Sequence, residues 1–249
     1  MIELRNVNKI FNEGTANSVH ALKDINLKID KGEFLVLLGS NGSGKSSLIN
    51  IIAGNTSVSS GDIYIENKKV NHLKDFERSK WIARIFQNPL MGTAPDLSII
   101  DNFRLASLRT RKKFFESGIT NKFRSQVQEK IRMLDMGLEN KLDVAVGSLS
   151  GGQRQALTLS MAIMDEAKIL LMDEPTAALD PKSAELLMSN SIKFISLFGF
   201  TTIFITHHLK DAYRFGDRII QMQEGNIIRD LNKDEKEKLK LNDLYEWFE

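Results

Sequence analysis

The sequence predicts an α/β protein with a parallel-sheet core, an antiparallel β part near its start and an inserted α-helical part. The first third is rich in strand patterns, since two alternating segments and a hairpin-like segment occur there. From about Pro89 the spacing of apolar residues becomes helical, and after Gly147 short apolar runs alternate with helical patterns. This order places the helical part between two parts that contain strands.

The individual elements follow from local patterns. Strands are predicted where apolar and polar residues alternate or where a short run is apolar, at residues 2–11, 19–29, 34–38, 61–65, 69–70, 168–172, 201–206, 218–222 and 227–228. Helices are predicted where apolar residues recur at helical spacing, at residues 47–54, 99–108, 123–136, 153–165, 181–197 and 233–249. The 249 residues suit a single domain, with the core and antiparallel β part at 1–88 and 166–249 and the helical subdomain at about 89–165.

Composition narrows the function classes. The net charge of +2 gives no sign of a strongly basic nucleic-acid binder. Because the chain has no cysteine, it has no disulfide framework and no thiolate metal site. The first residues lack the form of a signal peptide, and no apolar run approaches the roughly 18 residues of a membrane span. We therefore expect that the chain does not cross a bilayer by itself.

A glycine-rich loop lies between the apolar strand at 34–38 and the helix that follows. It fits G-x-x-x-x-G-K-[ST] at every fixed position, with the residues Gly39, Ser40, Asn41, Gly42, Ser43, Gly44, Lys45 and Ser46. The glycines let backbone N–H groups point at a phosphate, and the helix adds the positive end of its dipole. Lys45 can reach the outer phosphates and Ser46 can bind Mg²⁺. The alternative is an ordinary glycine-rich turn, but the flanking strand and helix favour binding of a nucleoside triphosphate.

Two adjacent carboxylates, Asp173 and Glu174, follow the apolar strand at 168–172. Asp173 is placed to hold Mg²⁺, directly or through water. Glu174 is placed to orient and deprotonate an attacking water. Acids at a strand end are common, but downstream of a phosphate loop this pair indicates hydrolysis of the nucleotide.

A second glycine turn, Leu149-Ser150-Gly151-Gly152-Gln153, leads into the helix predicted at 153–165. The same physics that makes the first loop an anion site applies here, although one nucleotide does not obviously need two such loops. The alternative is a glycine-containing helix start with Ser150 as the N-cap.

These motifs, in this order, resemble those of the ATP-binding-cassette ATPases, whose signature is the pentapeptide Leu149–Gln153. Gln87 in Ile85-Phe86-Gln87-Asn88 is similar to that family's Q-loop glutamine, and Ala177-Ala178-Leu179-Asp180 is similar to its D-loop. His207 resembles the switch histidine, and Phe11 lies where the family has an aromatic that stacks on adenine. Leu97–Asn102 resembles the segment that opens the helical subdomain, so the resemblance covers nearly the whole chain.

The resemblance implies a P-loop NTPase core, with an antiparallel β subdomain and an inserted α-helical subdomain, that binds ATP and Mg²⁺. It implies that Glu174, His207 and Gln87 act in catalysis. It implies that Ser46, Gln87 and Asp173 hold the metal. The residues implied to contact ATP are Phe11, the whole loop from Gly39 to Ser46, Ser47, Ser150, Gly151, Gly152, Gln153 and Asp180. In the family ATP is sandwiched between two copies, so an ATP-dependent homodimer is expected, and this would explain two anion loops in one chain.

The resemblance also implies partners. In the family a cleft near Gln87 accepts a short helix of a membrane permease, which here must be a separate chain. We expect an importer with an extracytoplasmic substrate-binding protein, and a peripheral position on the cytoplasmic face of the plasma (inner) membrane. The sequence from Phe86 to Pro95 is similar to the corresponding segment in ATPases of amino-acid-type uptake systems. The alternatives are an exporter or lipid- or lipoprotein-handling ATPase and, less expected, a soluble nucleic-acid-handling one.

Some residues keep two interpretations. Phe11 stacks on adenine or is a core aromatic. His207 and His208 would point to opposite faces if a strand continued through them. The basic cluster formed by Arg104, Arg109, Arg111, Lys112 and Lys113 is a solvated face or, alternatively, a surface near lipid headgroups.

Overall fold

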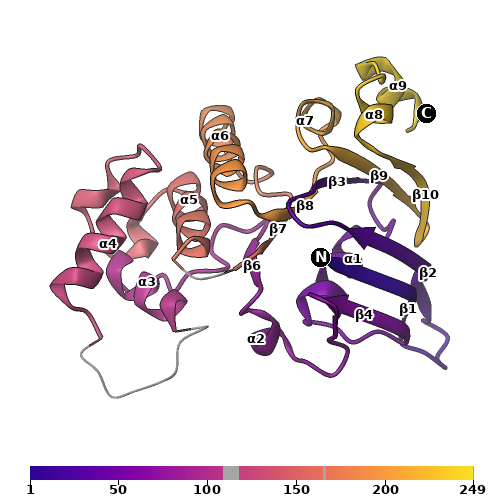
Figure 1. Ribbon diagram of the computed structural model, residues 1–249, viewed down its shortest axis with the longest axis horizontal. Coiled ribbons are helices and arrows are strands. Elements are labelled where there is room, and N and C mark those ends of the chain that lie inside the picture. The colour runs from indigo at the N-terminus through magenta and orange to yellow at the C-terminus, as the bar shows by residue number, and fades with distance from the viewer. Residues whose placement is uncertain (109–117, 165–166, 249) are drawn as a thin grey trace. The chain divides into compact units, whose positions relative to one another are not determined.

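The computed structural model describes residues 1–108, 118–164 and 167–248. The chain divides into two compact units (Figure 1). The first unit consists of Met1–Arg78 together with the residues from Phe200 onward, and the second consists of Ser79–Gly199.

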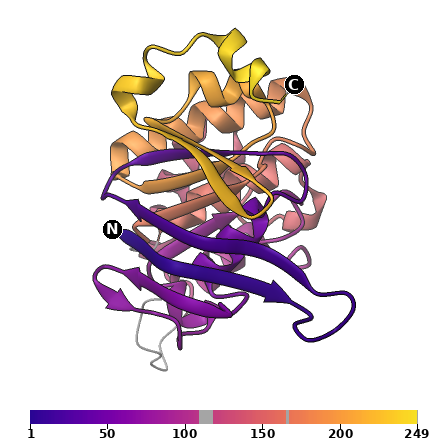
Figure 2. The ribbon, with the colours of Figure 1, turned by 90° about the vertical axis from the view of Figure 1, so that its right-hand side faces the viewer.

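The start of the first unit is an antiparallel sheet, as the alternating sequence predicts. Its strands lie in the order β2-β1-β4-β5, with the bounds β1 (Ile2–Phe11), β2 (Val19–Ile29), β4 (Ser60–Ile65) and β5 (Lys68–Lys69). Ile2 pairs with Ile29 on one side and with Ile65 on the other, and all three side chains are buried. The long indigo strands in Figure 2 are β1 and β2.

The parallel part of the first unit is centred on β3 (Phe34–Leu38). β3 pairs in parallel with β8 (Thr201–Ile205) and with β9 (Arg218–Gln223), and β10 (Asn226–Leu231) pairs antiparallel with β9. Every residue of β3 and β8 is buried. This burial explains why both strands are continuous apolar or β-branched runs instead of alternating ones.

Three helices of the first unit are α1 (Lys45–Ala53), α2 (Asp75–Arg78) and α7 (Leu209–Arg214). The helix α1 stops at Gly54, which adopts φ 87° and donates its N–H to the carbonyl of Asn50, as the sequence predicts. The guanidinium of buried Arg78 donates to the carbonyls of Ile51 and Ile52 at 2.6 and 2.9 Å. This cation satisfies the C-terminal end of α1 and favours its dipole.

The predicted single tail helix over residues 233–249 is wrong, because the described tail forms two short helices, α8 (Lys233–Lys236) and α9 (Leu241–Glu246). The helix α8 packs against β9 and β10, whereas α9 packs against α7. A new helix start forms where Asp243 accepts the N–H of Lys240 at 2.7 Å. Two packing surfaces therefore override one continuous helical pattern.

The second unit contains a parallel strand pair, β6 (Ile82–Ile85) and β7 (Ile169–Asp173), in which Ile82 lies opposite Ile169. Its helices are α3 (Ile99–Ser107), α4 (Asn121–Arg132), α5 (Gly151–Ala162) and α6 (Pro181–Phe198), with short 3-10 turns η1 (Leu138–Asn140) and η2 (Val146–Ser148). The predicted core stripe is confirmed, since Phe123, Val127, Ile131 and Leu134 are all buried.

Two helices in the second unit end earlier than the sequence predicts. The helix α4 ends at Arg132, not at Met136, because Asp135 adopts φ 55° and cannot continue a right-handed helix. The helix α5 begins at Gly151 and ends at Ala162, and Asp165 lies outside the described residues. In the basic cluster, Arg104 lies 5.8 Å from the ring centroid of Phe123, and the other four members lie outside the described residues.

Candidate functional site

The phosphate loop joins β3 to α1 in the first unit, and its glycines have a steric reason. Gly39 adopts φ 154°, and a Cβ there would lie 2.5 Å from the carbonyl oxygen of Met222. Gly44 adopts φ 106°, and a Cβ there would lie 2.6 Å from the carbonyl oxygen of Ala21. A side chain at either position would collide with backbone, so the curl of the loop requires glycine.

The amine of Lys45 lies against the loop. Its Nζ donates to the carbonyls of Gly39 and Ser40 at 2.7 and 2.9 Å, and the residue is only 6% exposed. The helix α1 starts after Gly44, a residue that has no side chain to cap the first turn. Ser46 is exposed at this helix start. A cation and a helix N-terminus thus coincide here, as binding of an anionic phosphate requires.

The acid pair lies at the end of β7 in the second unit. The carboxylate of Asp173 accepts a hydrogen bond from Nη2 of Arg84 at 2.8 Å, and both side chains are largely buried. Glu174 adopts φ 46°, and its Oε2 accepts from Nε2 of Gln87 at 3.3 Å. The structure therefore brings Gln87 and Glu174 together, as a pair that could orient a water.

Arg84 is the residue at this site that the sequence analysis missed. It is the charged member of the otherwise apolar strand β6, Ile82-Ala83-Arg84-Ile85. A charge in a strand that is predicted to be buried needs a partner, and that rule could have directed attention to the acids that follow the neighbouring strand.

The second glycine turn caps α5. Ser150 accepts the N–H of Gln153, and the Gln153 side chain accepts the N–H of Ser150, which completes a capping box. The helix-cap interpretation is therefore confirmed as the local geometry. A Cβ on Gly152 would lie 2.8 Å from the Cβ of Ser183 on α6, so this glycine also permits close helix packing.

Asp180 caps the next helix. Its carboxylate accepts the N–H of Ser183, the third residue of α6, at 3.0 Å. Hydrogen bonds from Ser183 lower the pKa of Asp180, so it is a carboxylate at neutral pH. The first turn of α6 thus carries both this cap and the side chain that packs on Gly152.

His207 and His208 follow β8 in the first unit, and the predicted opposite orientation is wrong. The strand ends at Ile205, and the Thr206 hydroxyl accepts the N–H of His208 at 3.0 Å. This turn sets the two rings 4.2 Å apart, and both residues are exposed. The alternation rule fails here because it holds only within a strand.

Phe11 ends β1 and is 37% exposed, with the amine of Lys9 4.8 Å from its ring centroid. This exposure contradicts the core interpretation of Phe11. An exposed aromatic face is available to stack on a base.

The donors predicted for Mg²⁺ have the chemistry that this ion prefers. Ser46, Gln87 and Asp173 offer a hydroxyl, an amide oxygen and a carboxylate, all hard oxygen ligands. Residues 1–108, 118–164 and 167–248 contain no group of three or more His, Cys, Asp or Glu placed to hold a metal. In proteins Mg²⁺ takes one or two carboxylates and completes its shell with water and substrate phosphates.

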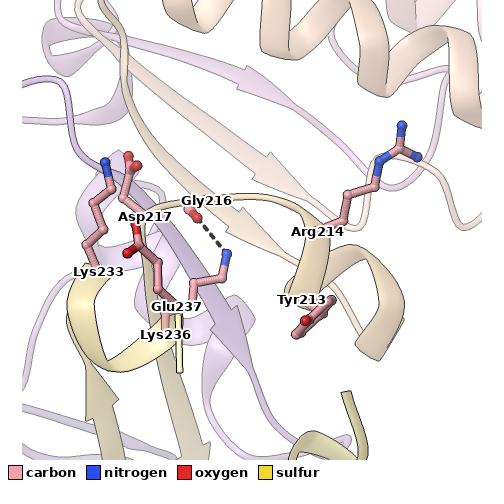
Figure 3. A pocket seen from close by; sticks show the side chains of 7 residues that line it. All are labelled: Tyr213, Arg214, Gly216, Asp217, Lys233, Lys236 and Glu237. Carbon is pink, nitrogen blue, oxygen red and sulfur yellow. Dashed lines mark hydrogen bonds between the residues drawn. The ribbon is translucent and has the colours of Figure 1, made fainter. Parts of the chain in front are cut away.

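A pocket of about 350 Å³ lies in the first unit, and none of its lining residues is a predicted site residue (Figure 3). Charged side chains of both signs line it, namely Arg214, Asp217, Lys233, Lys236 and Glu237. Lys236 is 9% exposed and donates to the carbonyl of Gly216 at 2.5 Å and to that of Phe215. Burial lowers the pKa of Lys236 to about 8, against the raising effect of Asp217. We interpret this pocket as the anchor of the C-terminal tail.

No helix in the described part of the chain is both long and apolar enough to cross a membrane.

Comparison with known proteins gives consistent matches. The family model described as "ABC transporter" matches residues 22–177. The tyrosine transport ATP-binding protein of Clostridioides difficile is 34% identical, over 100% of this chain and 99% of that protein. The phosphonates import ATP-binding protein PhnC of Lactobacillus acidophilus is also 34% identical, over 98% of this chain and 94% of that protein.

Two solved structures of one cassette are similar as well. The dimeric structure of MJ0796, a bacterial ABC transporter cassette, is 32% identical with a TM-score of 0.80, over 94% of this chain and 99% of that chain. A dimeric post-hydrolysis state of the same cassette with ADP and Pi has a TM-score of 0.79 at 32% identity, over the same shares of both chains.

Proposed function

This chain belongs to the ABC transporter family, and on that premise we propose that it binds and hydrolyses MgATP as a homodimer to drive solute import through a separate membrane permease. The family's activity is ATP hydrolysis coupled to transport. The α/β fold with a P-loop core, predicted from the sequence, is that of the similar cassettes. The observation that carries the hydrolytic part is the Gln87–Glu174 contact of 3.3 Å beside Asp173.

Each predicted residue then has a role. Lys45 and the N–H groups at the start of α1 bind the phosphates, and Phe11 stacks on the adenine. Glu174 takes the proton from the attacking water, with Gln87 and His207 assisting its placement. Bound Mg²⁺ would neutralise charge on the transferred phosphate, and Ser46, Asp173 and Gln87 are the residues proposed to hold it.

The homodimer supplies the second half of the site. Ser150, Gly151, Gly152 and Gln153 of one copy, with Asp180, would face the ATP bound by the phosphate loop of the other. One solved cassette that is similar to this chain is dimeric in two structures, which supports this arrangement.

The subdomain bounds at 1–88, 89–165 and 166–249 also stay a prediction.

Import is supported by the names of the relatives that match nearly the whole chain. The phosphonates relative is named for import and the tyrosine relative for transport, so the two agree on transport and differ on the ligand. An amino-acid-type ligand, an extracytoplasmic binding protein and a peripheral position on the cytoplasmic membrane face belong to the proposal. An exporter is the second candidate, and the low net charge of +2 argues against a nucleic-acid partner.

The hydrolytic role is tested by Glu174→Gln. We expect ATP binding to persist and turnover to fall at least ~10²-fold, the range for a removed general base. Phosphate release and calorimetry measure the two quantities. Glu129→Gln, the same change at an exposed site on α4, is the control and should leave both unchanged. Turnover near that of the wild type in Glu174→Gln would refute the assignment of the base.

Direction is tested by accumulation of a labelled amino acid in cells that lack the gene. Complementation with the wild-type chain should restore uptake, and complementation with Glu174→Gln should not. Higher accumulation in the deletion strain than in the complemented strain would identify an exporter instead.

A further inference from the structure

Arg84 carries a partly buried positive charge directly beside the predicted metal ligand. Its side chain is 13% exposed and that of Asp173 is 15% exposed, and Nη2 lies 2.8 Å from Oδ2. The two residues belong to the paired strands β6 and β7, in which Arg84 lies opposite Leu171, two residues before Asp173. Charge-assisted hydrogen bonds of this length are strong, and this one is sheltered from screening by salt.

The guanidinium has a second favourable contact. Its Cζ lies 4.6 Å from the ring centroid of Phe86, two residues along the chain. The main-chain carbonyl of Phe86 is in turn held by the side-chain amide of Gln155 on α5, at 3.0 Å. Arg84 therefore has an aromatic partner besides the carboxylate, on a residue whose main chain is hydrogen-bonded to α5.

We propose that Arg84 is a positioning residue that occupies the carboxylate of Asp173 in the absence of metal and so sets the affinity of the site for Mg²⁺. This inference depends on the proposed function, because it takes Asp173 as a metal ligand. A guanidinium and Mg²⁺ both seek the same carboxylate, and the fixed charge of Arg84 also repels a divalent cation nearby. Mg²⁺ must therefore displace Arg84 from the carboxylate of Asp173 or share that carboxylate with it. Stable binding of the metal then depends on the phosphates of ATP.

The test compares the affinity for a non-hydrolysable ATP analogue with Mg²⁺ and with EDTA, by calorimetry on the full chain. The ratio of the dissociation constant in EDTA to that in Mg²⁺ measures how much the metal strengthens nucleotide binding. Arg84→Met removes the competing cation, and we expect the ratio to rise about fivefold or more, within the range of coupling between contacting residues. Arg84→Gln is a second neutral variant, and it should shift the ratio in the same direction. It replaces Arg84→Met in the test if that variant folds poorly.

A double variant shows whether Arg84 acts through Asp173. Asp173→Asn alone should lower the ratio, and adding Arg84→Met to it should then change nothing further. Arg124→Met is the matched control, because Arg124 makes a similar 2.7 Å pair with Asp143 on an exposed surface of the same unit. That variant should keep the wild-type ratio.

The outcomes separate the two proposals. If Arg84→Met leaves the ratio unchanged or lowers it while Asp173→Asn lowers it, the inference about Arg84 is refuted and the metal site stands. If the gain from Arg84→Met persists in the Asp173→Asn background, Arg84 acts as a distant charge and the inference also fails. If Asp173→Asn has no effect, the metal assignment of the proposed function is what fails.

Discussion

The buried amine of Lys45 is the residue on which nucleotide binding depends most directly. It lies 2.7 Å from the carbonyl of Gly39, inside the loop, so a bound phosphate would meet a cation already in place. Lys45→Ala should weaken ATP binding at least about tenfold, since a hydrogen bond to a charged group contributes roughly 1.5–3 kcal/mol. Calorimetry measures the loss, with exposed Lys31→Ala as the control. Unchanged affinity in Lys45→Ala would mean that this loop is not the phosphate site.

The buried amine of Lys236 makes stability depend on pH. Its pKa is lowered to about 8 in the folded chain, below the ordinary value of 10.5. Between these two pH values the unfolded chain binds more protons, so the free energy of unfolding rises as pH rises through this window. The neutral amine still has N–H donors for the carbonyls of Phe215 and Gly216. Urea unfolding at several pH values should show this rise in the wild type relative to Lys236→Met. If the free energies of unfolding of the two proteins changed with pH in the same way, this role of Lys236 would be contradicted.

The packing of α5 on α6 is sensitive at a single atom. An added Cβ at Gly152 would lie 2.8 Å from the Cβ of Ser183, which has no rotamer that could move it away. Gly152→Ala should therefore lower the free energy of unfolding by about 1–3 kcal/mol, the usual cost of overpacking. For a chain of this size the melting temperature should fall by about 2 to 12 °C.

Two further variants make that result specific. Ser183→Gly combined with Gly152→Ala should recover most of the loss, because it removes the atoms that clash. Gly151→Ala meets Leu179 only at 3.3 Å, so it should cost less. Equal losses in Gly151→Ala and Gly152→Ala would show that the N-terminus of α5, and not its contact with α6, is the cause.

For the whole molecule the central prediction is assembly on ATP. We expect the chain to be largely monomeric without nucleotide and dimeric with MgATP when Glu174→Gln blocks hydrolysis. Each γ-phosphate would then contact both copies through charge-assisted hydrogen bonds. Light scattering with and without MgATP measures the change of mass.

Ser150→Arg in the Glu174→Gln background separates binding from assembly. It places a long side chain where the partner's phosphate would lie and leaves Lys45 untouched, so ATP should bind without dimerisation. The lost N-cap costs about 1 kcal/mol, so the variants are compared only where both are folded. Ser125→Arg, exposed on α4, is the control. Dimers of the Ser150→Arg variant on ATP would mean that Leu149–Gln153 is a helix cap and nothing more.

The sequence by itself determined the features that depend on neighbours along the chain. The apolar run 34–38, the glycines of the loop and the stop at Gly54 predict β3, the phosphate loop and α1, because steric and periodic rules act within a few residues. The hairpins at 61–70 and 218–228 follow from the same rules. The order of the motifs also predicted the family to which the chain belongs.

Only the tertiary structure decided what depends on residues far apart. The tail breaks into α8 and α9 because its two parts pack against different elements. Arg84 meets Asp173, 89 positions along the chain, because β6 and β7 pair in parallel, and Gly152 meets Ser183 because α5 packs on α6. Such contacts are fixed by how strands and helices pack in three dimensions, and no local pattern encodes which distant side chain will be the partner.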